Sequence, residues 1–502
     1  MCNFKKISIF IIFVIMMAAF SSGVFAKTVT IATSNDALTL DAYMLSETPT
    51  NSVNHMISEP LTFFDKEMNV IPGLAESWEA VDDTTWIFNL RKGVKFHNGE
   101  EFTAEDVKFS IERAQNHPKS QMKSYVADIE EVNIIDEYTI EFKTLYPTPI
   151  LARKLQSVVM YSKDYTEANT DSHMQNNPVG TGPYMVESWE KDEEMVLTFF
   201  EDYWREKPEV DRVILRPITN PATRVAALLS GEVDILIDLP VQDVENIKEN
   251  GGVEVITLPD LRLIFLGMET TEGPLADVRV RKAIYHAINE DAIVEHVMNG
   301  HAYPASQFFP EFVFGYNPNI ERLEYDPEKA KELLAEAGYP DGFTIQLDSS
   351  NDRYINDGQT AQAVAIQLAR VGINVELNVQ TKSAHFDKVL SRNTEFYLLG
   401  WSTNGDGASA LEALLHTPEG KYGRFNLGDY SNKEFDRLTE EAAQTLDPEK
   451  RLKLMQQAVK IAMDDVAQIP LHFQQQIYAV QNYIDWTPRP NKYLKPYEIG
   501  FK

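Results

Sequence analysis

The chain has 502 residues, with 46 Lys and Arg against 76 Asp and Glu, and its formal net charge is −30. So acidic a chain argues against binding to nucleic acid or to anionic membranes, because both require a basic surface. The length suggests about three domains, and a chain of this size can bury a large core without disulfides.

The first 26 residues have the pattern of a secretory signal peptide. Lys5 and Lys6 precede an almost wholly apolar stretch over residues 7–20, and a small-residue cleavage site of the A-x-A kind ends at Ala26. The apolar stretch is shorter than the roughly 18 residues of a membrane helix. Cys2 precedes that stretch, so it is not a lipid-attachment cysteine at the cleavage site. We expect cleavage near Ala26 and an exported protein in a Gram-negative periplasm, without a lipid anchor.

Helix and strand signals alternate along the remaining chain. The segment KTVTIAT at residues 27–33 alternates as a half-buried strand does. Further on, Asn220 can cap a helix, Pro221 suits its first position, and Gly231 ends it. The strand signal VDILI follows directly.

The same order of signals recurs twice in the second half. Residues 326–338 run from a capping aspartate and a proline to a terminal glycine. A helix is predicted over residues 359–371, and INVELNV at residues 373–379 then alternates, with its apolar side chains expected to face inward. Repeated helix–strand succession predicts an α/β fold.

The segment KFHNGEEFTAEDVKFSIERA at residues 95–114 combines a histidine with several acids, which could suggest a metal site or an acid/base pair. A structural interpretation accounts for it better. Asn98-Gly99 is a turn signal, and Thr103 with Asp106 three residues later is a variant of the capping box that precedes a helix.

The common catalytic and cofactor motifs are absent from the sequence. It contains no H-E-x-x-H, G-x-S-x-G, G-x-G-x-x-G or P-loop pattern. Cleavage at Ala26 would also remove Cys2, the only cysteine, and with it any disulfide, thiolate nucleophile or cysteine metal site. We expect no enzyme activity, no catalytic residue, no metal ligand and no cofactor.

The segment FYLLGW at residues 396–401 is apolar without alternation, which predicts a central strand covered on both faces. Ligands of α/β proteins lie beyond the carboxyl ends of strands, where Trp401, Asn404 and Asp406 would stand. Trp401 suits the wall of a binding site, and Asp406 could pair with an amine. The alternative is a core tryptophan followed by an Asp-Gly turn.

Two further loops are candidates for a site. Residues 348–358 follow a strand signal and contain Arg353, which could bind a carboxylate, and Tyr354, which could form an aromatic wall; the alternative is a solvated loop. In PVGTGPY at residues 178–184, the glycines around Thr181 indicate close approach to a ligand or a tight crossover between domains.

Several motifs together resemble the extracellular solute-binding proteins of ABC transporters, in the dipeptide, oligopeptide and nickel-binding family known as family 5. The resemblance covers essentially the whole chain after residue 26. The motifs that carry it are SEPL, LAESW, TWIFNLRKGVKFHNGEEFTAEDVKFS, NNPVGTGPY, FFEDYW, VRVRKAIYHAIN, DPEKAKELLAEAGY and YSNKEFDRL.

The resemblance implies a fold of two lobes joined by hinge strands, with a ligand cleft between them and an extra domain inserted in the first lobe. The implied parts are lobe I at residues 27–50, 178–265 and 477–502, the inserted domain at residues 51–177, and lobe II at residues 266–476.

The resemblance also implies ligand contacts from the loop after the first strand, from the PVGTGPY segment and from loops of the second lobe. Carried onto this sequence, they are Leu40, Asp41, Thr181, Gly182, Arg353, Tyr354, Trp401, Asn404 and Asp406. Family members that bind peptides often have an aspartate after GW for the ligand's amino group, commonly with Asp-Pro nearby. Here STNGDGAS follows GW and contains no proline.

The implied function is capture of a small organic solute by lobe closure and its delivery to an inner-membrane ABC permease. Di- and oligopeptides are the leading solutes, and an opine, a glutathione-like compound or an oligosaccharide remains open. A metal chelate or haem is a second alternative, supported by His416 and scattered methionines alone. A secreted hydrolase is an alternative of another class. We expect a monomer that does not bind nucleic acid.

Overall fold

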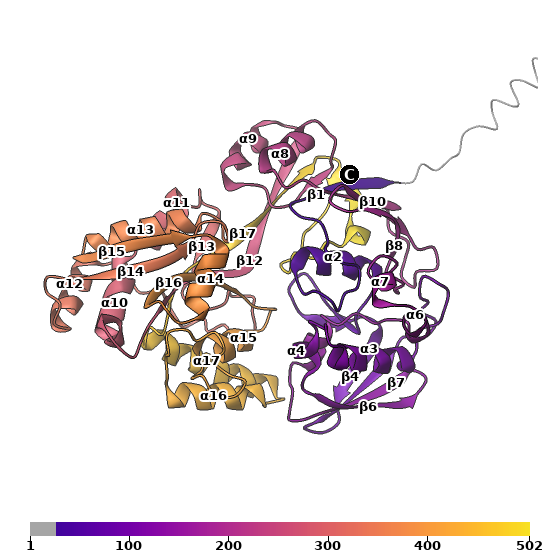
Figure 1. Cartoon of the computed structure of the whole chain (residues 1–502), viewed down its shortest axis with the longest axis horizontal. Helices are drawn as coiled ribbons and strands as arrows, with labels where there is room; N and C mark the ends of the chain where they lie inside the picture. Colours follow the sequence, from indigo (N-terminus) through magenta and orange to yellow (C-terminus); the bar gives the residue numbers. More distant parts are fainter. Residues whose placement is uncertain (1–26) are drawn as a thin grey trace, which may run out of the picture.

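The computed structural model describes residues 27–502, which form two lobes joined by long strands (Figure 1). The predicted signal peptide, residues 1–26, lies outside the described residues. Within residues 27–502, no helix combines the length and the apolar character that crossing a membrane requires.

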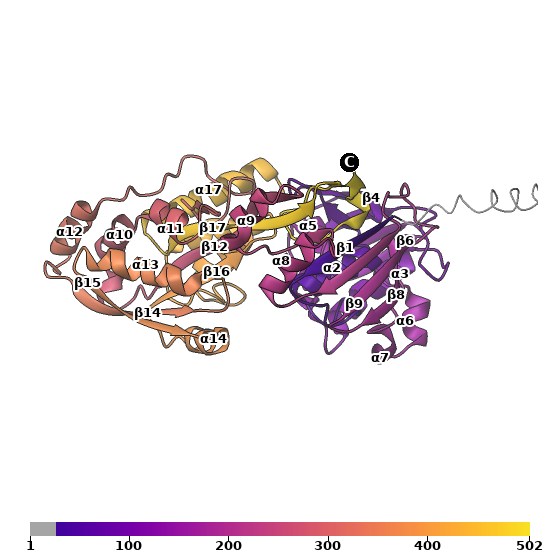
Figure 2. The ribbon, with the colours of Figure 1, turned by 90° about the horizontal axis from the view of Figure 1, so that it is seen from above.

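One eleven-stranded sheet extends through both lobes in the order β15-β14-β16-β12-β17-β11-β1-β10-β9-β8, with β13 attached to β17. Two long antiparallel strands, β12 (Val253–Met268) and β17 (Ile469–Gln481), pass from one lobe to the other (Figure 2). Their pairing register shifts between Pro259 and Leu263. Proline has no N–H to donate, so the hydrogen-bond ladder is interrupted at this point.

Lobe I contains both ends of the described chain. Its first strand, predicted from the alternation of KTVTIAT, runs parallel to β10 and to β11. The elements of this part are β1 (Thr28–Thr33), α2 (Thr48–Ile57), β8 (Tyr184–Glu190), β9 (Glu194–Phe199), β10 (Arg212–Pro217), α8 (Pro221–Leu229), β11 (Ile235–Leu236), α9 (Val244–Glu249), β18 (Ile484–Asp485) and β19 (Gly500–Phe501).

A separate antiparallel sheet in the order β4-β5-β7-β6 forms a small domain beside it, with its own core. Its elements, with a neighbouring hairpin, are β2 (Thr62–Phe64), β3 (Val70–Pro72), β4 (Ala75–Ala80), β5 (Thr85–Leu90), α3 (Ala104–Asn116), α4 (Lys123–Val126), β6 (Ile129–Asp136), β7 (Thr139–Thr144), α5 (Leu151–Leu155), α6 (Lys163–Ala168) and α7 (Asp171–Met174). The residue boundaries given above for the lobes and the inserted domain remain predictions.

Lobe II packs helices on the other half of the large sheet (Figure 1). Its elements are α10 (Val278–Ala287), α11 (Glu290–His296), β13 (Ala302–Pro304), α12 (Pro327–Glu336), β14 (Phe343–Ser350), α13 (Asp357–Ala369), β15 (Ile373–Gln380), α14 (Lys382–Leu390), β16 (Phe396–Ser402), α15 (Ala408–Ala410), α16 (Lys433–Ala443) and α17 (Pro448–Asp464). The central position predicted for FYLLGW is confirmed, because β16 lies between β14 and β12.

The predicted helix caps form as the sequence indicates. Asn220 accepts a hydrogen bond from the N–H of Thr223 at 3.0 Å, and Asp326 accepts one from the N–H of Lys329 at 2.9 Å. Each bond satisfies a backbone donor at a helix start that has no partner within the helix. Local sequence therefore determined where α8 and α12 begin.

The structural interpretation of residues 95–114 is also confirmed. The N–H of Thr103 donates to the carboxylate of Asp106 at 2.9 Å, and α3 begins at the next residue. Gly99 has φ +87°, a conformation that glycine adopts without strain. The segment builds a turn and a helix start, and it needs no metal or acid/base chemistry to account for its residues.

Two predictions differ in detail from the structure. The helix expected over residues 359–371 is shifted toward the N-terminus, at Asp357–Ala369. The alternation in residues 373–379 predicted four inward side chains, but Leu377 and Val379 are exposed. The reason is that β15 lies at the edge of the sheet, so the far half of the strand borders water.

Candidate functional site

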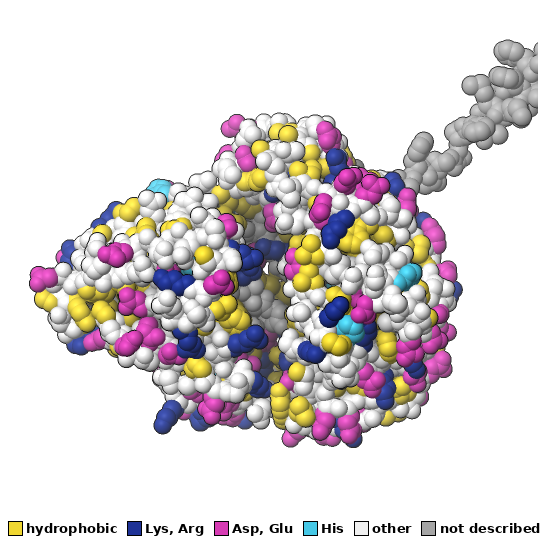
Figure 3. All heavy atoms as spheres, in the orientation of Figure 1, with side chains coloured by type: hydrophobic (Ala, Val, Ile, Leu, Met, Phe, Trp, Pro, Cys, Tyr) yellow, Lys and Arg dark blue, Asp and Glu magenta, His cyan; other side chains and the backbone are white. Residues whose placement is uncertain are grey.

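A cavity of about 480 Å³ lies beside β12 and β17 and receives residues from both lobes. Its volume falls within the roughly 300–1,000 Å³ of small-molecule sites. A cleft separates the lobes in Figure 3, and Lys and Arg side chains gather along its walls. The cavity is lined by Asn35, Asp238, Leu239, Pro240, Val241, Gln242, Arg262, Arg353, Tyr354, Ile355, Asn356, Gln474, Gln475, Gln476, Ile477 and Lys492.

The carboxyl ends of three strands supply much of this lining. Asn35 follows β1, Asp238 follows β11, and Arg353 follows β14. Ligands of α/β proteins commonly bind at the carboxyl ends of strands, because side chains there extend beyond the sheet and the helices that cover it. Two of these strands belong to lobe I and one to lobe II, so a ligand in the cavity touches both lobes.

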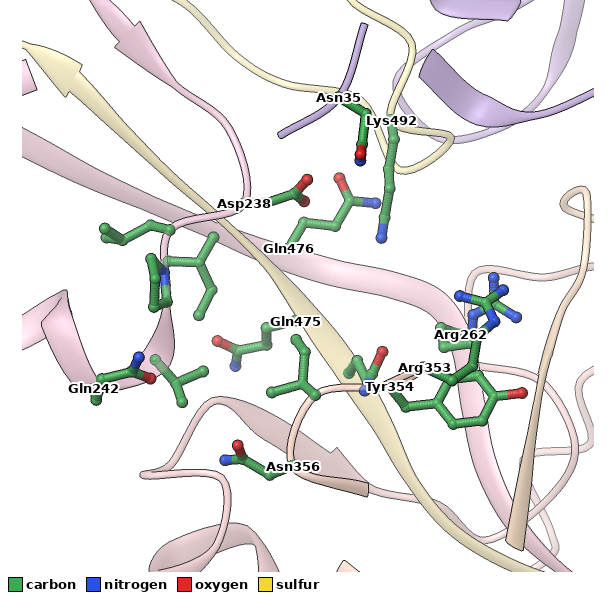
Figure 4. Close-up of a pocket in the computed structure, with 16 residues that line it drawn as sticks. Asn35, Asp238, Gln242, Arg262, Arg353, Tyr354, Asn356, Gln475, Gln476 and Lys492 are labelled. Atoms are coloured by element: carbon green, nitrogen blue, oxygen red, sulfur yellow. The ribbon is translucent and has the colours of Figure 1, made fainter. Parts of the chain in front are cut away.

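Arg262 and Arg353 both lie beside one aromatic ring. The guanidinium carbons of Arg262 and Arg353 lie 5.9 Å and 5.1 Å from the ring centroid of Tyr354 (Figure 4). The hydroxyl of Tyr354 donates to the carbonyl of Gly400 at 3.4 Å, which holds the ring against β16. Burial lowers the pKa of Arg262, yet an arginine stays protonated in proteins.

Hinge strand β17 adds three consecutive glutamines, Gln474, Gln475 and Gln476. The side chain of Gln476 donates to the carbonyl of Pro490, whereas the side-chain nitrogen of Gln474 is buried and has no partner among residues 27–502. Amide side chains both donate and accept hydrogen bonds. This strand therefore presents groups that can bind the amide or hydroxyl groups of a solute.

Of the nine predicted site residues, Arg353 and Tyr354 line the cavity. The structure places Asp41 in the interior of lobe I instead, with no exposed surface. Its carboxylate pairs with Arg113 at 2.7 Å and accepts from the hydroxyl of Tyr161 at 2.8 Å. Neighbouring Leu40 belongs to a hydrophobic core, so this loop serves the scaffold of lobe I.

Thr181 and Gly182 also lie away from the cavity. Gly182 packs so closely on the end of α2 that an added Cβ would come within 2.5 Å of the carbonyl oxygen of Met56. Its N–H donates to the carbonyl of Ile57 at 2.8 Å, and Thr181 is fully buried. The glycines of PVGTGPY thus permit a close approach between two backbone segments of lobe I.

Trp401 and Asn404 do not line the cavity either. The indole of Trp401 packs against Phe425 at a centroid distance of 5.3 Å, and its buried N–H has no partner among residues 27–502. The carbonyl of Asn404 accepts from the guanidinium of Arg153 at 2.8 Å. Since Arg153 lies on α5 of the small domain, this bond links lobe I to lobe II.

A second contact strengthens the same bridge, because the ammonium of Lys421 lies 4.0 Å from the ring centroid of Tyr146. Arg153 also donates to the carbonyl of Met68 at 3.0 Å, which anchors it on its own lobe. We call Arg153, Asn404, Lys421 and Tyr146 the rim contact. In Figure 1, α4 of the small domain faces α15 of lobe II.

The structure places Asp406 inside lobe II, where it is 3% exposed. Both of its oxygens bind Arg451 of α17, at 2.6 Å and 2.9 Å, and the N–H of Ala408 adds a third bond. Burial alone would raise the pKa of Asp406, but the charge and hydrogen bonds of Arg451 outweigh it and lower the pKa. The carboxylate is fully occupied and does not face a ligand's amine.

Sequence analysis missed the cavity residues of the hinge strands and of the segments from lobe I, among them Arg262, Gln475 and Lys492. A signal for some of them was present. Asp260 and Arg262 interrupt an otherwise apolar run, and QQQ interrupts LHF and IYAV. Polar groups within a buried strand are informative because burying them unpaired costs free energy.

Comparisons with known proteins extend over nearly the whole chain. The family model described as bacterial extracellular solute-binding proteins, family 5 middle, matches residues 69–422. The glutathione-binding protein GsiB of Salmonella choleraesuis (strain SC-B67) is 31% identical over 466 residues, 89% of each chain. The dipeptide-binding protein of Escherichia coli (strain K12) is 31% identical over 427 residues, 79% of each chain. The solved structure of HbpA2 from Haemophilus parasuis has a TM-score of 0.87 at 26% identity, and covers 95% of this chain and 100% of that one.

We predict that Asp406→Ala lowers the free energy of unfolding by about 3–5 kcal/mol, because Arg451 is left buried without its counter-charge. Urea denaturation at neutral pH measures this. The matched control is Asp464→Ala. It removes an exposed ion pair with Lys460 on α17, the helix that also carries Arg451, and should change the free energy of unfolding by less than about 1 kcal/mol. Equal effects of the two substitutions would contradict the prediction.

The lowered pKa of Asp406 also determines how the stability contributed by the Asp406–Arg451 pair changes with pH. The folded carboxylate is more acidic than the unfolded one, so the pair contributes fully above the unfolded pKa of about 3.9. The contribution is lost as the pH falls through the folded pKa. The stability difference between the parent protein and Asp406→Ala should therefore shrink on acidification below pH 4.

We predict that Arg153→Ala shifts the solute-free protein toward a more open form, because it removes a charged hydrogen bond between the lobes worth about 1.5–3 kcal/mol. Small-angle scattering should record a larger radius of gyration than for the parent protein. Arg370→Ala, on the exposed end of α13, is the control. An unchanged radius for Arg153→Ala would show that the rim contact does not restrain the lobes.

Proposed function

Because this chain belongs to the bacterial extracellular solute-binding proteins of family 5, we propose that it captures a small organic solute between its lobes and delivers it to an inner-membrane ABC permease. A di- or oligopeptide is the leading solute. The protein would act as an exported, periplasmic monomer, and capture would make and break no covalent bond in the solute.

The observation that carries this proposal is the cavity at the junction of the lobes, beside the strands that join them. A solute held there contacts lobe I through Asn35 and Asp238 and lobe II through Arg353 and Tyr354. Contacts to both lobes form only when the lobes are close, so binding favours the closed form. A permease that recognises the closed form would distinguish loaded from empty protein.

The chemistry of the lining supports a peptide-like solute. Arg353 can bind a carboxylate through two parallel hydrogen bonds, and Gln474 and Gln475 can bind peptide N–H and C=O groups. Asp238 lies at the end of the cavity away from the arginines (Figure 4) and can bind an amino group. The aspartate that we predicted for that role, Asp406, is instead engaged with Arg451.

The similar proteins named above include a glutathione-binding and a dipeptide-binding protein. Both names denote solutes with peptide bonds and carboxylates, and the cavity of this chain offers groups for both. A glutathione-like compound or an opine therefore stays within the proposal as an alternative solute. An oligosaccharide has no charge for Arg353 to bind, and is less well matched to this lining.

The proposal predicts that the lobes close on a solute that accompanies the protein from its own periplasm. Native mass spectrometry followed by denaturation identifies that solute, and scattering of the emptied protein with and without it measures closure. We expect a smaller radius of gyration on addition. A protein whose radius responds neither to its own solute nor to peptides would contradict the transport role, as would turnover of the solute.

We also predict that Arg353→Gln weakens binding of that solute by roughly 1.5–3 kcal/mol, as for loss of a charged hydrogen bond. Isothermal titration calorimetry measures the change. Arg370→Gln removes an exposed arginine at the far end of the following helix and should leave the affinity unchanged. Equal affinities of Arg353→Gln and the parent protein would remove Arg353 from the site.

A further inference from the structure

We propose that the cavity selects a solute whose bound end carries two neighbouring carboxylates, as in a peptide with a C-terminal Glu or Asp, and that Arg262 determines this selectivity. The inference rests on the proposed function, since it names the chemical class of the solute for the same cavity. Arg353 would bind one carboxylate, and Arg262, on the hinge strand, would bind the second.

The first step of the argument is that neither guanidinium group has a direct partner, although the charge of Asp260 acts on Arg262 from nearby. Neither forms an ion pair or a side-chain hydrogen bond with another residue in the part of the chain that the structure describes. By contrast, Lys492, the third cation of the lining, pairs with Asp260 at 2.6 Å. Two unpaired positive charges beside one ring repel each other, so the empty cavity has an electrostatic cost that a dianion removes.

The second step is that the carboxylates of Asp260 and Asp357, which bind the backbone beside the two arginines, are already engaged. Asp260 accepts from the ammonium of Lys492 and from the backbone N–H of Arg262 at 3.2 Å. Asp357 accepts from the backbone N–H of Arg353 at 3.1 Å, and from the N–H of Tyr354 and the hydroxyl of Ser350. Each acid orients the main chain next to an arginine and leaves the guanidinium free for a solute.

The third step concerns the orientation of the Arg262 side chain. It lies within the register shift of β12, between Pro259 and Leu263. An irregularity of this kind in a strand turns a side chain out of the regular alternation. Tyr354, fixed by its bond to Gly400, gives the guanidinium a flat surface to stack on. The position of Arg262 is therefore set by backbone geometry and by an aromatic support.

The last step is the charge distribution along the cavity. Asp238 is the one acid among the lining residues and lies at the other end from the arginines (Figure 4). Its carboxylate accepts from the hydroxyl of Ser34 at 2.9 Å. A solute with an amine at one end and two carboxylates at the other matches this order of charges, and a solute with a single carboxylate leaves one arginine unpaired.

The test compares two dipeptides, Ala-Glu and Ala-Gln, which differ only in the second carboxylate. Calorimetry on the emptied protein should give Ala-Glu the higher affinity by about tenfold or more, as expected for a charged hydrogen bond. Arg262→Gln should abolish this preference by weakening Ala-Glu binding and leaving Ala-Gln binding nearly unchanged. Arg262→Lys keeps the positive charge but lacks the planar guanidinium that can form two parallel hydrogen bonds, so it should retain part of the preference. The control Arg370→Gln should retain the whole preference.

Each outcome bears on the inference. Equal affinities for the two dipeptides in the parent protein, or an equal loss for both in Arg262→Gln, would overturn it. A neutral or basic solute released from the native protein would also overturn it, while lobe closure on that solute would leave the proposed function standing. A released solute with two neighbouring carboxylates whose affinity falls in Arg262→Gln would support it. Absence of closure with every solute would overturn both proposals. Arg262→Lys takes the place of the glutamine variant if the latter fails to fold.

Discussion

The pairing of β12 with β17 is the constraint on which the rest of this structure depends. These two strands pair over most of their length and hold the lobes together, and they also form one wall of the cavity. The pairing of the two strands is interrupted between Pro259 and Leu263, next to the site. A solute in the cavity would contact the same strands that connect the lobes. Binding of a solute and movement of the lobes would therefore affect each other.

Charge is distributed unevenly between the surface and the site. The chain carries a large net negative charge, yet cations predominate in the cavity. The deeply buried acids Asp41 and Asp406 are each paired with an arginine of the same lobe. Such pairs keep the walls rigid, because breaking either one would leave a buried charge without compensation. Arg262 and Arg353 differ from these in having no partner, which is the arrangement expected where a ligand supplies the counter-charge.

Two kinds of contact join the lobes, and they differ in strength. At the hinge edge, covalent continuity and the β-ladder hold the lobes at all times. The rim contact adds one guanidinium–carbonyl bond and one cation–π contact, and beside it Phe64 and Met68 of the small domain pack into the core cluster of lobe II. A solute that contacts both lobes would favour the closed form by as much as its affinity for that form exceeds its affinity for the open one.

The sequence by itself determined the elements whose signals are local. Caps such as Asn220, Thr103 and Asp326 started helices where expected, and the unbroken apolar run of FYLLGW lay in the middle of the sheet. The motif series was sufficient for the family and its two-lobed fold. It also pointed to the loop after β14, because a strand end can be recognised without knowing its neighbours.

Only the tertiary structure decided which charged side chains are available to a ligand. Asp41 and Asp406 looked like candidates until their partners, Arg113 and Arg451, were brought beside them from 72 and 45 residues away. Arg262 was not among the predicted site residues, and the fold places it without an ion-pair partner at the cavity. Whether a charged side chain has an ion-pair partner depends on residues that are distant in sequence. A local sequence pattern does not show which of those residues the fold brings beside it.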